Sequence, residues 1–172
     1  VTGNGDGLIP SILLANIKPI VVAPAMNTKM WLNQAVQRNY KLLENYDNVL
    51  SLKPNEGLLA CDEFGSGKIV PNDLIQLAVE FIETNKPKLY CKDLLNKEFL
   101  ITGGGTSEKI DAARNITNKS SGTMGLLLAQ VARFRGAKVK YIHGPLRIEK
   151  DITDGIKRFE VQTSTVSYTH LT

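Results

Sequence analysis

Residues 57–69, GLLACDEFGSGKI, place one cysteine among several glycines. Cys61 stands between Gly57 on one side and Gly65 and Gly67 on the other. A cysteine that serves packing belongs in a strand or helix as a small apolar residue, whereas glycine loses backbone entropy on folding and supplies no side chain to pack. We therefore expect a flexible loop that folds over a ligand and carries the Cys61 thiol. An inert, buried thiol is the alternative.

A second glycine-rich stretch follows an apolar run near the middle of the chain. Gly103, Gly104 and Gly105 come directly after residues 98–102, and glycines after a strand let backbone N–H groups approach phosphate. The spacing does not fit the dinucleotide fingerprint G-x-G-x-x-G, because its third glycine is replaced by Glu108. A nicotinamide-dependent dehydrogenase is therefore disfavoured. A simple glycine turn followed by a serine helix cap is the structural alternative.

A third stretch, residues 24–31 (PAMNTKMW), lies where an apolar run meets a helical pattern. Asn27 at this junction could offer a ligand both an amide donor and an acceptor. Doubly wound α/β folds bind ligands beyond the carboxyl ends of their strands, which is the expected position of this stretch. Asparagine also commonly caps helices, and spacing alone favours the cap.

The elements that must position these residues are short strands alternating with helices. We predict strands at residues 19–23, 48–52, 98–102 and 137–143. We predict helices at residues 28–46, 72–85 and 121–135. This alternation indicates the α/β class, with two incomplete doubly wound (Rossmann- or flavodoxin-like) domains, each built on a mainly parallel sheet.

A polar segment containing Pro87 separates the two halves of the chain. We predict a first domain at residues 1–86, a linker at 87–97 and a second domain at 98–172. The first half shows far fewer strands than the roughly five or six of a complete doubly wound domain. We therefore expect an internal fragment that holds the end of one domain and the start of another. The polar tail at residues 166–172 is expected to be non-native.

The composition excludes several classes of protein. Lys and Arg number 21 against 17 Asp and Glu, a net charge of +4, and the two signs are interspersed, so a basic stripe for nucleic acid is not indicated. No apolar run reaches the roughly 20 residues that span a bilayer. Cys61 and Cys91 form no CxxC motif, which favours reduced thiols over a disulfide framework or a zinc site. We expect a cytoplasmic protein without membrane or nucleic-acid partners, and assign no metal ligands.

Residues 24–31 and 57–68 together resemble the flavin-dependent cysteine decarboxylases, in particular phosphopantothenoylcysteine decarboxylase. The first stretch matches the substrate-binding motif Pro-Ala-Met-Asn-x-x-Met-Trp of this family. The second matches its clamp Gly-x-Leu-Ala-Cys-x-x-x-Gly-x-Gly-Arg/Lys, with Lys68 in place of the commoner Arg. The resemblance implies FMN as cofactor, Cys61 as the proton donor to the product and Asn27 as the ligand of the departing carboxylate. A thiol with an ordinary pKa of about 8.5 is protonated at neutral pH, as this task requires.

The same resemblance assigns the residues around this site. It implies that Met30, Ala60 and Lys68 contact the substrate. It implies flavin contacts for Gly3, Asp6, Ala25 and Met26. The general-base histidine of the family has no counterpart in the first half, because the histidines of the chain are His143 and His170. We expect His143 to lie at the end of a strand without a catalytic role.

Residues 101–125 resemble the opening of phosphopantothenate–cysteine ligase. The matching positions are Thr102, Gly104, Thr106, Glu108, Ile110, Asp111, Arg114, Ile116, Asn118, Ser120, Ser121, Gly122, Met124 and Gly125. Thr123 stands where this family usually has Lys, which could weaken a phosphate contact, and Ala112-Ala113 stand where Pro-Val is common.

The ligase resemblance implies a substrate carboxylate that attacks CTP to give an acyl-cytidylate, which the amine of cysteine then resolves. Mg²⁺ would neutralise the triphosphate. Asn118 would act on the acyl intermediate by donating to its carbonyl oxygen. Nucleotide contacts are implied for Gly103, Gly104, Gly105, Thr106, Ser120, Ser121 and Gly122.

The order of these motifs is that of bacterial enzymes that fuse two steps of coenzyme A synthesis. They join phosphopantothenate to cysteine with CTP, and decarboxylate the product to 4′-phosphopantetheine. The family's decarboxylase half forms trimers and its ligase half dimers, so a homo-oligomer is implied for the full-length protein, while the fragment alone is expected to be inactive. Two alternatives stay open: a related flavoprotein decarboxylase with another substrate, and a non-catalytic regulatory flavin-binding protein.

Overall fold

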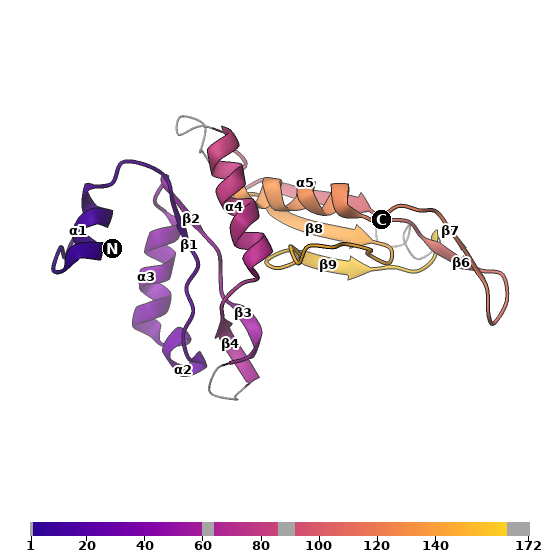
Figure 1. The fold of residues 1–172 in the computed structure, drawn as a ribbon, viewed down its shortest axis with the longest axis horizontal. Helices are drawn as coiled ribbons and strands as arrows, with labels where there is room; N and C mark the ends of the chain where they lie inside the picture. The colour runs from indigo at the N-terminus through magenta and orange to yellow at the C-terminus, as the bar shows by residue number, and fades with distance from the viewer. Residues whose placement is uncertain (1, 60–63, 86–91, 165–172) are drawn as a thin grey trace. The chain divides into compact units, whose positions relative to one another are not determined.

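The computed structural model describes residues 2–59, 64–85 and 92–164 (Figure 1). The chain forms two compact units, residues 1–91 and 92–172. Each unit is an α/β structure with its own parallel strands, which confirms the predicted fold class. No helix in the described part of the chain is long and apolar enough to cross a bilayer.

The first unit is built around a pair of parallel strands. Its elements are α1 (Leu8–Ala15), β1 (Ile20–Val22), α2 (Thr28–Trp31), α3 (Gln34–Glu44), β2 (Val49–Ser51), β3 (Asn55–Leu58), β4 (Phe64–Lys68) and α4 (Asn72–Asn85). Strand β1 pairs with β2 in parallel, with Ile20 opposite Val49. Figure 1 shows α3 and α4 on opposite sides of this pair, where α3 packs on β2 and α4 on β1. Helices on both faces are the local arrangement of a doubly wound sheet.

The predicted helix over residues 28–46 is wrong in one respect, because it is interrupted. Asn33 ends the run: its side chain accepts a hydrogen bond from Ala35 N at 2.9 Å and caps α3. Short polar side chains compete with helix continuation in this way. Trp31, only 3% exposed, ends α2 and packs edge-on against Tyr40 at a ring distance of 5.0 Å. The predicted helix over 72–85 is confirmed as α4.

The predicted loop over residues 57–69 is also corrected. Strands β3 and β4 form an antiparallel hairpin in which Gly57 lies opposite Gly65. Gly57 and Gly65 therefore lie in paired backbone, whereas Gly67 lies at the point where the register shifts and has a φ of 126°. Cys61 and Ala60, which stand between these two strands in the sequence, lie outside the described residues.

The second unit carries a three-stranded parallel sheet in the order β5-β8-β9. Its elements are β5 (Glu98–Gly103), β6 (Ser107–Lys109), β7 (Asn115–Thr117), α5 (Thr123–Phe134), β8 (Lys138–His143) and β9 (Lys157–Glu160). Helix α5 packs on β5 and β8 and buries Leu126, Ala129 and Phe134. Strands β5 and β8 and helix α5 confirm the predicted elements, and His143 ends β8 as expected.

One buried polar side chain fixes the loop before β9. Gln130 of α5 is fully buried, and its Nε2 donates to the carbonyl oxygens of Ile152 and Asp154 at 2.6 and 2.8 Å. Arg133 in turn donates to Gln130 Oε1 at 3.1 Å. Buried backbone carbonyls need such partners, so Gln130 positions the chain that leads into β9.

Residues 92–97, the described part of the predicted linker, form a turn that belongs to the second unit. Leu94 N donates to Arg135 O at 3.0 Å, and Lys138 N donates to Lys97 O at 2.9 Å. Asp93 forms an ion pair with Arg135, and this hydrogen-bonded guanidinium lowers the pKa of the Asp93 carboxyl. The turn therefore ties the end of α5 to the starts of β5 and β8.

Candidate functional site

In the second unit, glycines gather at the carboxyl ends of β5 and β8. Gly103, the last residue of β5, lies opposite His143 in register. Gly144 N donates to Gly103 O at 3.3 Å, and a Cβ atom at Gly144 would overlap the carbonyl oxygen of Gly105. The two strand ends thus approach closely enough to exclude side chains, at the edge where ligands bind to parallel sheets.

Helix α5 begins beside the same glycines. Its N-cap is Gly122, which has φ of 80° and no capping side chain; Ser121 Oγ instead accepts from Thr123 N at 3.2 Å. A Cβ atom at Gly122 would lie 3.4 Å from Gly104 Cα. The structure therefore brings together the two predicted nucleotide-binding stretches, with the first N–H groups of α5 beside the glycine turn, an arrangement suited to phosphate.

Tyr141 supports this arrangement of glycines with its hydroxyl group and its ring. Its hydroxyl donates to Gly122 O at 2.9 Å, and the residue is fully buried. Burial raises the pKa of the Tyr141 hydroxyl, which keeps it a donor. The ring fills the space where side chains at Gly103 and Gly125 would stand. The sequence motifs alone did not identify Tyr141 or Gly144, because their roles depend on how β8 pairs with β5.

Asn118 lies against the glycine turn. A Cβ atom at Gly105 would overlap Asn118 Oδ1, and this oxygen accepts from Ser120 N at 3.1 Å. Thr117 Oγ1 donates to Thr106 O at 2.9 Å. Asn118 is exposed, so its amide NH₂ group is the part that can donate to a ligand. The predicted catalytic amide and the predicted nucleotide contacts thus converge.

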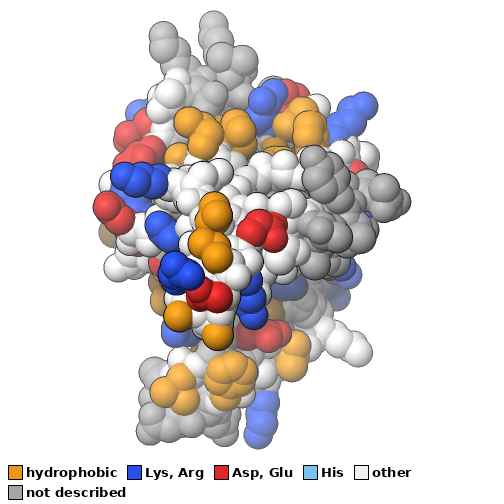
Figure 2. All heavy atoms as spheres, turned by 90° about the vertical axis from the view of Figure 1, so that its right-hand side faces the viewer, with side chains coloured by type: hydrophobic (Ala, Val, Ile, Leu, Met, Phe, Trp, Pro, Cys, Tyr) orange, Lys and Arg blue, Asp and Glu red, His pale blue; other side chains and the backbone are white. Residues whose placement is uncertain are grey.

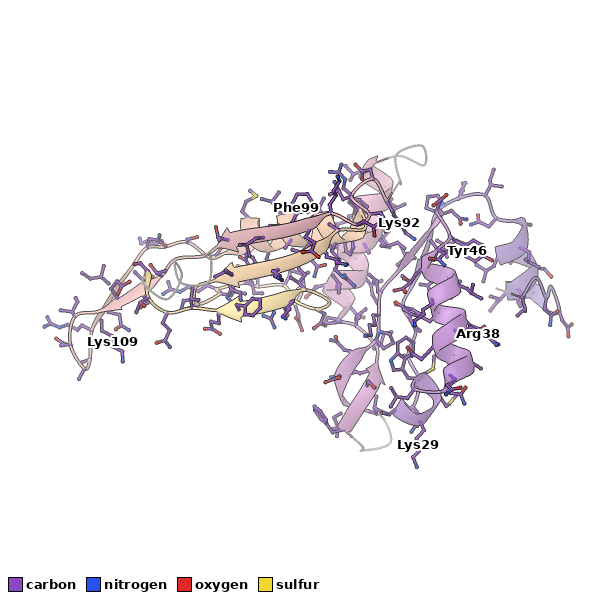
Figure 3. All side chains as sticks on the ribbon, turned by 180° about the vertical axis from the view of Figure 1, so that it is seen from behind. Lys29, Arg38, Tyr46, Lys92, Phe99 and Lys109 are labelled. Atoms are coloured by element: carbon purple, nitrogen blue, oxygen red, sulfur yellow. The ribbon has the colours of Figure 1, made fainter. Side chains whose placement is uncertain are left out.

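Glu108 from the ligase-like motif makes a structural contact. Its Oε1 accepts from Ser164 N and Ser164 Oγ at 2.7 and 2.6 Å, and Ser107 N donates to Gln162 O at 2.6 Å. These bonds tie β6 to the chain that follows β9. Figures 1 and 3 show the β6–β7 hairpin, with Lys109 labelled in Figure 3, extending beyond the carboxyl edge of the sheet.

The Glu108 contact predicts a pH dependence. Hydrogen bonds from Ser164 lower the pKa of Glu108, so its contribution to stability is present above the ordinary glutamate pKa of about 4.3 and is lost as the pH falls through the lowered value. In Glu108→Gln we expect the stability of the second unit to fall less than in the wild type as the pH is lowered. Denaturant midpoints measured between pH 3 and 6 check this. An unchanged pH dependence in the variant would contradict the contact.

In the first unit, Asn27 caps α2, as its spacing favoured. Its Oδ1 accepts from Lys29 N at 2.9 Å, and its backbone carbonyl accepts from Trp31 N at 2.9 Å. Asn27 follows the carboxyl end of β1, the ligand-binding edge of such sheets. Figure 3 shows α2, with Lys29 labelled, beside the β3–β4 hairpin, which it contacts through β4. The Asn27 turn and the predicted clamp therefore lie together.

Of the other predicted substrate residues, Met30 and Lys68 lie within the described part of the first unit. Met30 is 59% exposed, as a residue available to a ligand would be. Lys68 ends β4, and its side chain lies across Gly57.

The predicted flavin residues do not gather into one site. Gly3 borders a pocket of about 720 Å³ whose walls include Leu13, Ile20 and Val49. Ala25, by contrast, is exposed in the segment after β1, and Met26 is hydrogen-bonded to Gly67 of β4. Asp6 is exposed in the segment before α1, where its N–H donates to Asn4 Oδ1 at 3.0 Å. The described residues of the first unit therefore do not form a complete flavin cavity.

The face in Figure 2 carries Lys and Arg side chains beside Asp and Glu. Within the described residues, His, Cys, Asp and Glu form no group of three or more that could hold a metal ion.

Two known protein families match successive parts of the chain. Residues 1–83 match the flavoprotein family, and residues 94–171 match the C-terminal domain of DNA/pantothenate metabolism flavoproteins. The two matches follow one another along the chain in the order expected from the motifs.

Particular relatives carry both parts. The chain is 38% identical over 151 residues to the coenzyme A biosynthesis bifunctional protein CoaBC of Bacillus subtilis, covering 86% of this chain and 36% of the relative. It is 36% identical over 162 residues to CoaBC of Vibrio cholerae, covering 94% and 38%. The chain is thus a homologue of these bifunctional proteins, as the motifs predicted, and spans little more than a third of their length.

A solved structure is also similar. The crystal structure of the C-terminal domain of CoaBC shows 36% sequence identity over 45% of this chain and 39% of that domain, with a TM-score of 0.41.

Proposed function

We propose that the chain is the central part of a bifunctional enzyme of coenzyme A synthesis. In this proposal residues 1–86 end a flavin-dependent decarboxylase domain and residues 98–172 begin a CTP-dependent ligase domain. Residues 87–97 link the two domains, and residues 92–97 of this linker pack on the ligase side. The observation that carries it is the convergence of Asn118, the glycine turn and the start of α5 on one edge of the second sheet. The sequential family matches support the pairing of the two activities.

For the ligase step, the geometry suits an activated, phosphate-bearing substrate. The glycine turn and the N-terminus of α5 present backbone N–H groups to the triphosphate of CTP. The amide NH₂ of Asn118 donates to the carbonyl oxygen on which negative charge develops when cysteine attacks the acyl-cytidylate. Mg²⁺ would bind mainly through the triphosphate oxygens, since it commonly binds with substrate phosphates and few carboxylates.

For the decarboxylase step, Asn27 would bind the carboxylate of phosphopantothenoylcysteine, with Met30, Ala60 and Lys68 around the substrate and Cys61 as acid. FMN when bound would supply the oxidation of the substrate thiol that makes loss of carbon dioxide possible. Flavin binding rests on the family match, because the described part of the first unit forms only pieces of such a cavity. The chain's own contribution here is to hold and orient the substrate carboxylate.

The test is direct assay of the complete gene product that contains this chain. We expect a yellow protein that consumes CTP with phosphopantothenate and cysteine, releases CMP and pyrophosphate, and decarboxylates added phosphopantothenoylcysteine. A colourless protein with ligase activity alone would reject the decarboxylase half. Decarboxylation without CTP consumption would reject the ligase half.

A further inference from the structure

We propose that Gly65 and Gly67 are positioning residues, through which β4 holds the turn that carries Asn27. The inference rests on the proposed decarboxylase function, in which the Asn27 amide binds the substrate carboxylate.

The first contact joins Gly67 to Met26. Met26 N donates to Gly67 O at 2.9 Å. A Cβ atom at Gly67 would overlap the carbonyl oxygen of Met26, and the φ of Gly67 is 126°, a conformation that disfavours residues with side chains. Strand β4 therefore touches both the amide and the carbonyl of the residue that precedes Asn27.

The second contact joins Gly65 to Thr28. A Cβ atom at Gly65 would overlap Thr28 Oγ1 and would lie 3.1 Å from Thr28 Cβ and Cγ2. Thr28 Oγ1 is buried and has no hydrogen-bond partner within the described residues. The contact is thus steric packing, and Gly65 is required for close approach alone, since its φ lies outside the left-handed region.

The two contacts are made to the residues that directly precede and follow Asn27 in the chain. Met26 and Thr28 are held by β4, while the Asn27 carbonyl and Oδ1 are bound within α2. Helix α2 is itself anchored by the buried Trp31. A shift of β4 must therefore move the Asn27 amide, and a misplacement of about 1 Å can cost on the order of 100-fold in rate.

The test is Gly65→Ala in the complete bifunctional protein. We expect kcat/KM for decarboxylation to fall about 100-fold, with ligation unchanged. Adding Thr28→Ala removes Oγ1, the nearest atom, and Cγ2, and keeps the 3.1 Å approach to Thr28 Cβ. The double variant should recover at least about a tenfold part of the loss.

A second comparison distinguishes positioning from general damage. If Gly65 acts through Asn27, Gly65→Ala should cost little more when Asn27 is already alanine. Ser66→Ala, on the opposite face of the same strand, is the matched control and should keep wild-type decarboxylation. Hydrogen exchange at the Met26 amide gives a readout independent of activity: protection should fall in Gly65→Ala and return with Thr28→Ala.

Three results would each overturn the proposal. The first is wild-type decarboxylation and Met26 protection in Gly65→Ala. The second is a loss that is equally large with and without the Asn27 amide. The third is a loss that Thr28→Ala does not relieve. If the unmodified protein ligates but does not decarboxylate, the proposed function of the first unit fails instead, and the inference about Asn27 fails with it.

Discussion

Asn118→Asp should abolish most ligation while leaving decarboxylation intact in the complete protein. Aspartate has the shape of asparagine, and its carboxylate can still accept the hydrogen bond from Ser120 N that orders this turn. It cannot donate to a developing oxyanion, and its charge opposes the phosphates of CTP. Loss of one such donor lowers kcat by about 100- to 1,000-fold. We expect a fall of at least about 100-fold in CMP release.

The two half-reactions locate the defect. If Asn118 acts on the acyl-cytidylate, the variant should release pyrophosphate in a first turnover and then release little CMP. Asn115→Asp is the matched control, because it places the same charge on an exposed position of β7, the strand that directly precedes Asn118. Equal ligation rates in wild type and Asn118→Asp would remove Asn118 from the mechanism. Equal losses in Asn118→Asp and Asn115→Asp would show that added charge alone causes the effect.

Elements with strong local signals could be predicted from the sequence with good boundaries. Helix α4 follows Pro71 and has regular apolar spacing, so residues 72–85 were predicted as observed. The break at Asn33 was missed, because Leu32, Val36 and Tyr40 continue the helical spacing across it. A cap within an apolar pattern depends on side-chain competition for backbone donors, which periodicity does not record.

The glycine-rich hairpin shows a different limit. Glycine is poor in strands by propensity, so residues 57–69 were predicted as a loop. The structure places Gly65 and Gly67 in β4 because Met26 and Thr28 occupy the space of their side chains. Strands β6 and β7 were missed because they are short, with mostly exposed side chains, so they carry no alternation of buried and exposed residues.

The candidate ligase site could be predicted only where residues lie in continuous motifs. Gly103–Gly105 and Ser120–Gly122 were identified from two stretches, and the structure brings them together. Tyr141 and Gly144 were not identified, because their roles follow from the parallel pairing of β5 with β8. Such pairing joins segments far apart in the chain, and local patterns do not specify it.

Gly144→Ala should unfold or strongly weaken the second unit while sparing the first. A Cβ atom at this position would overlap the carbonyl oxygen of Gly105 and lie 2.7 Å from its carbonyl carbon. Both atoms belong to the backbone, so no side-chain rotation relieves the overlap. Steric crowding of this kind lowers the free energy of unfolding by up to about 3 kcal/mol. Gly105 also lies against Asn118, so a shift of Gly105 should disturb this contact and CTP-dependent ligation should be lost as well.

The chain allows the two units to be followed separately. Its one tryptophan, Trp31, is buried in the first unit, so tryptophan fluorescence in a urea titration reports that unit alone. In Gly144→Ala this transition should not move, whereas hydrogen exchange in β5, β8 and α5 should accelerate. Gly57→Ala is the matched control, because a Cβ atom there meets only the flexible Lys68 side chain, and it should leave both signals near wild type. If hydrogen exchange in the second unit of Gly144→Ala stayed at the wild-type rate, Gly144 could not be packed closely against Gly105. The close packing that brings Asn118 near the start of α5 would then be refuted.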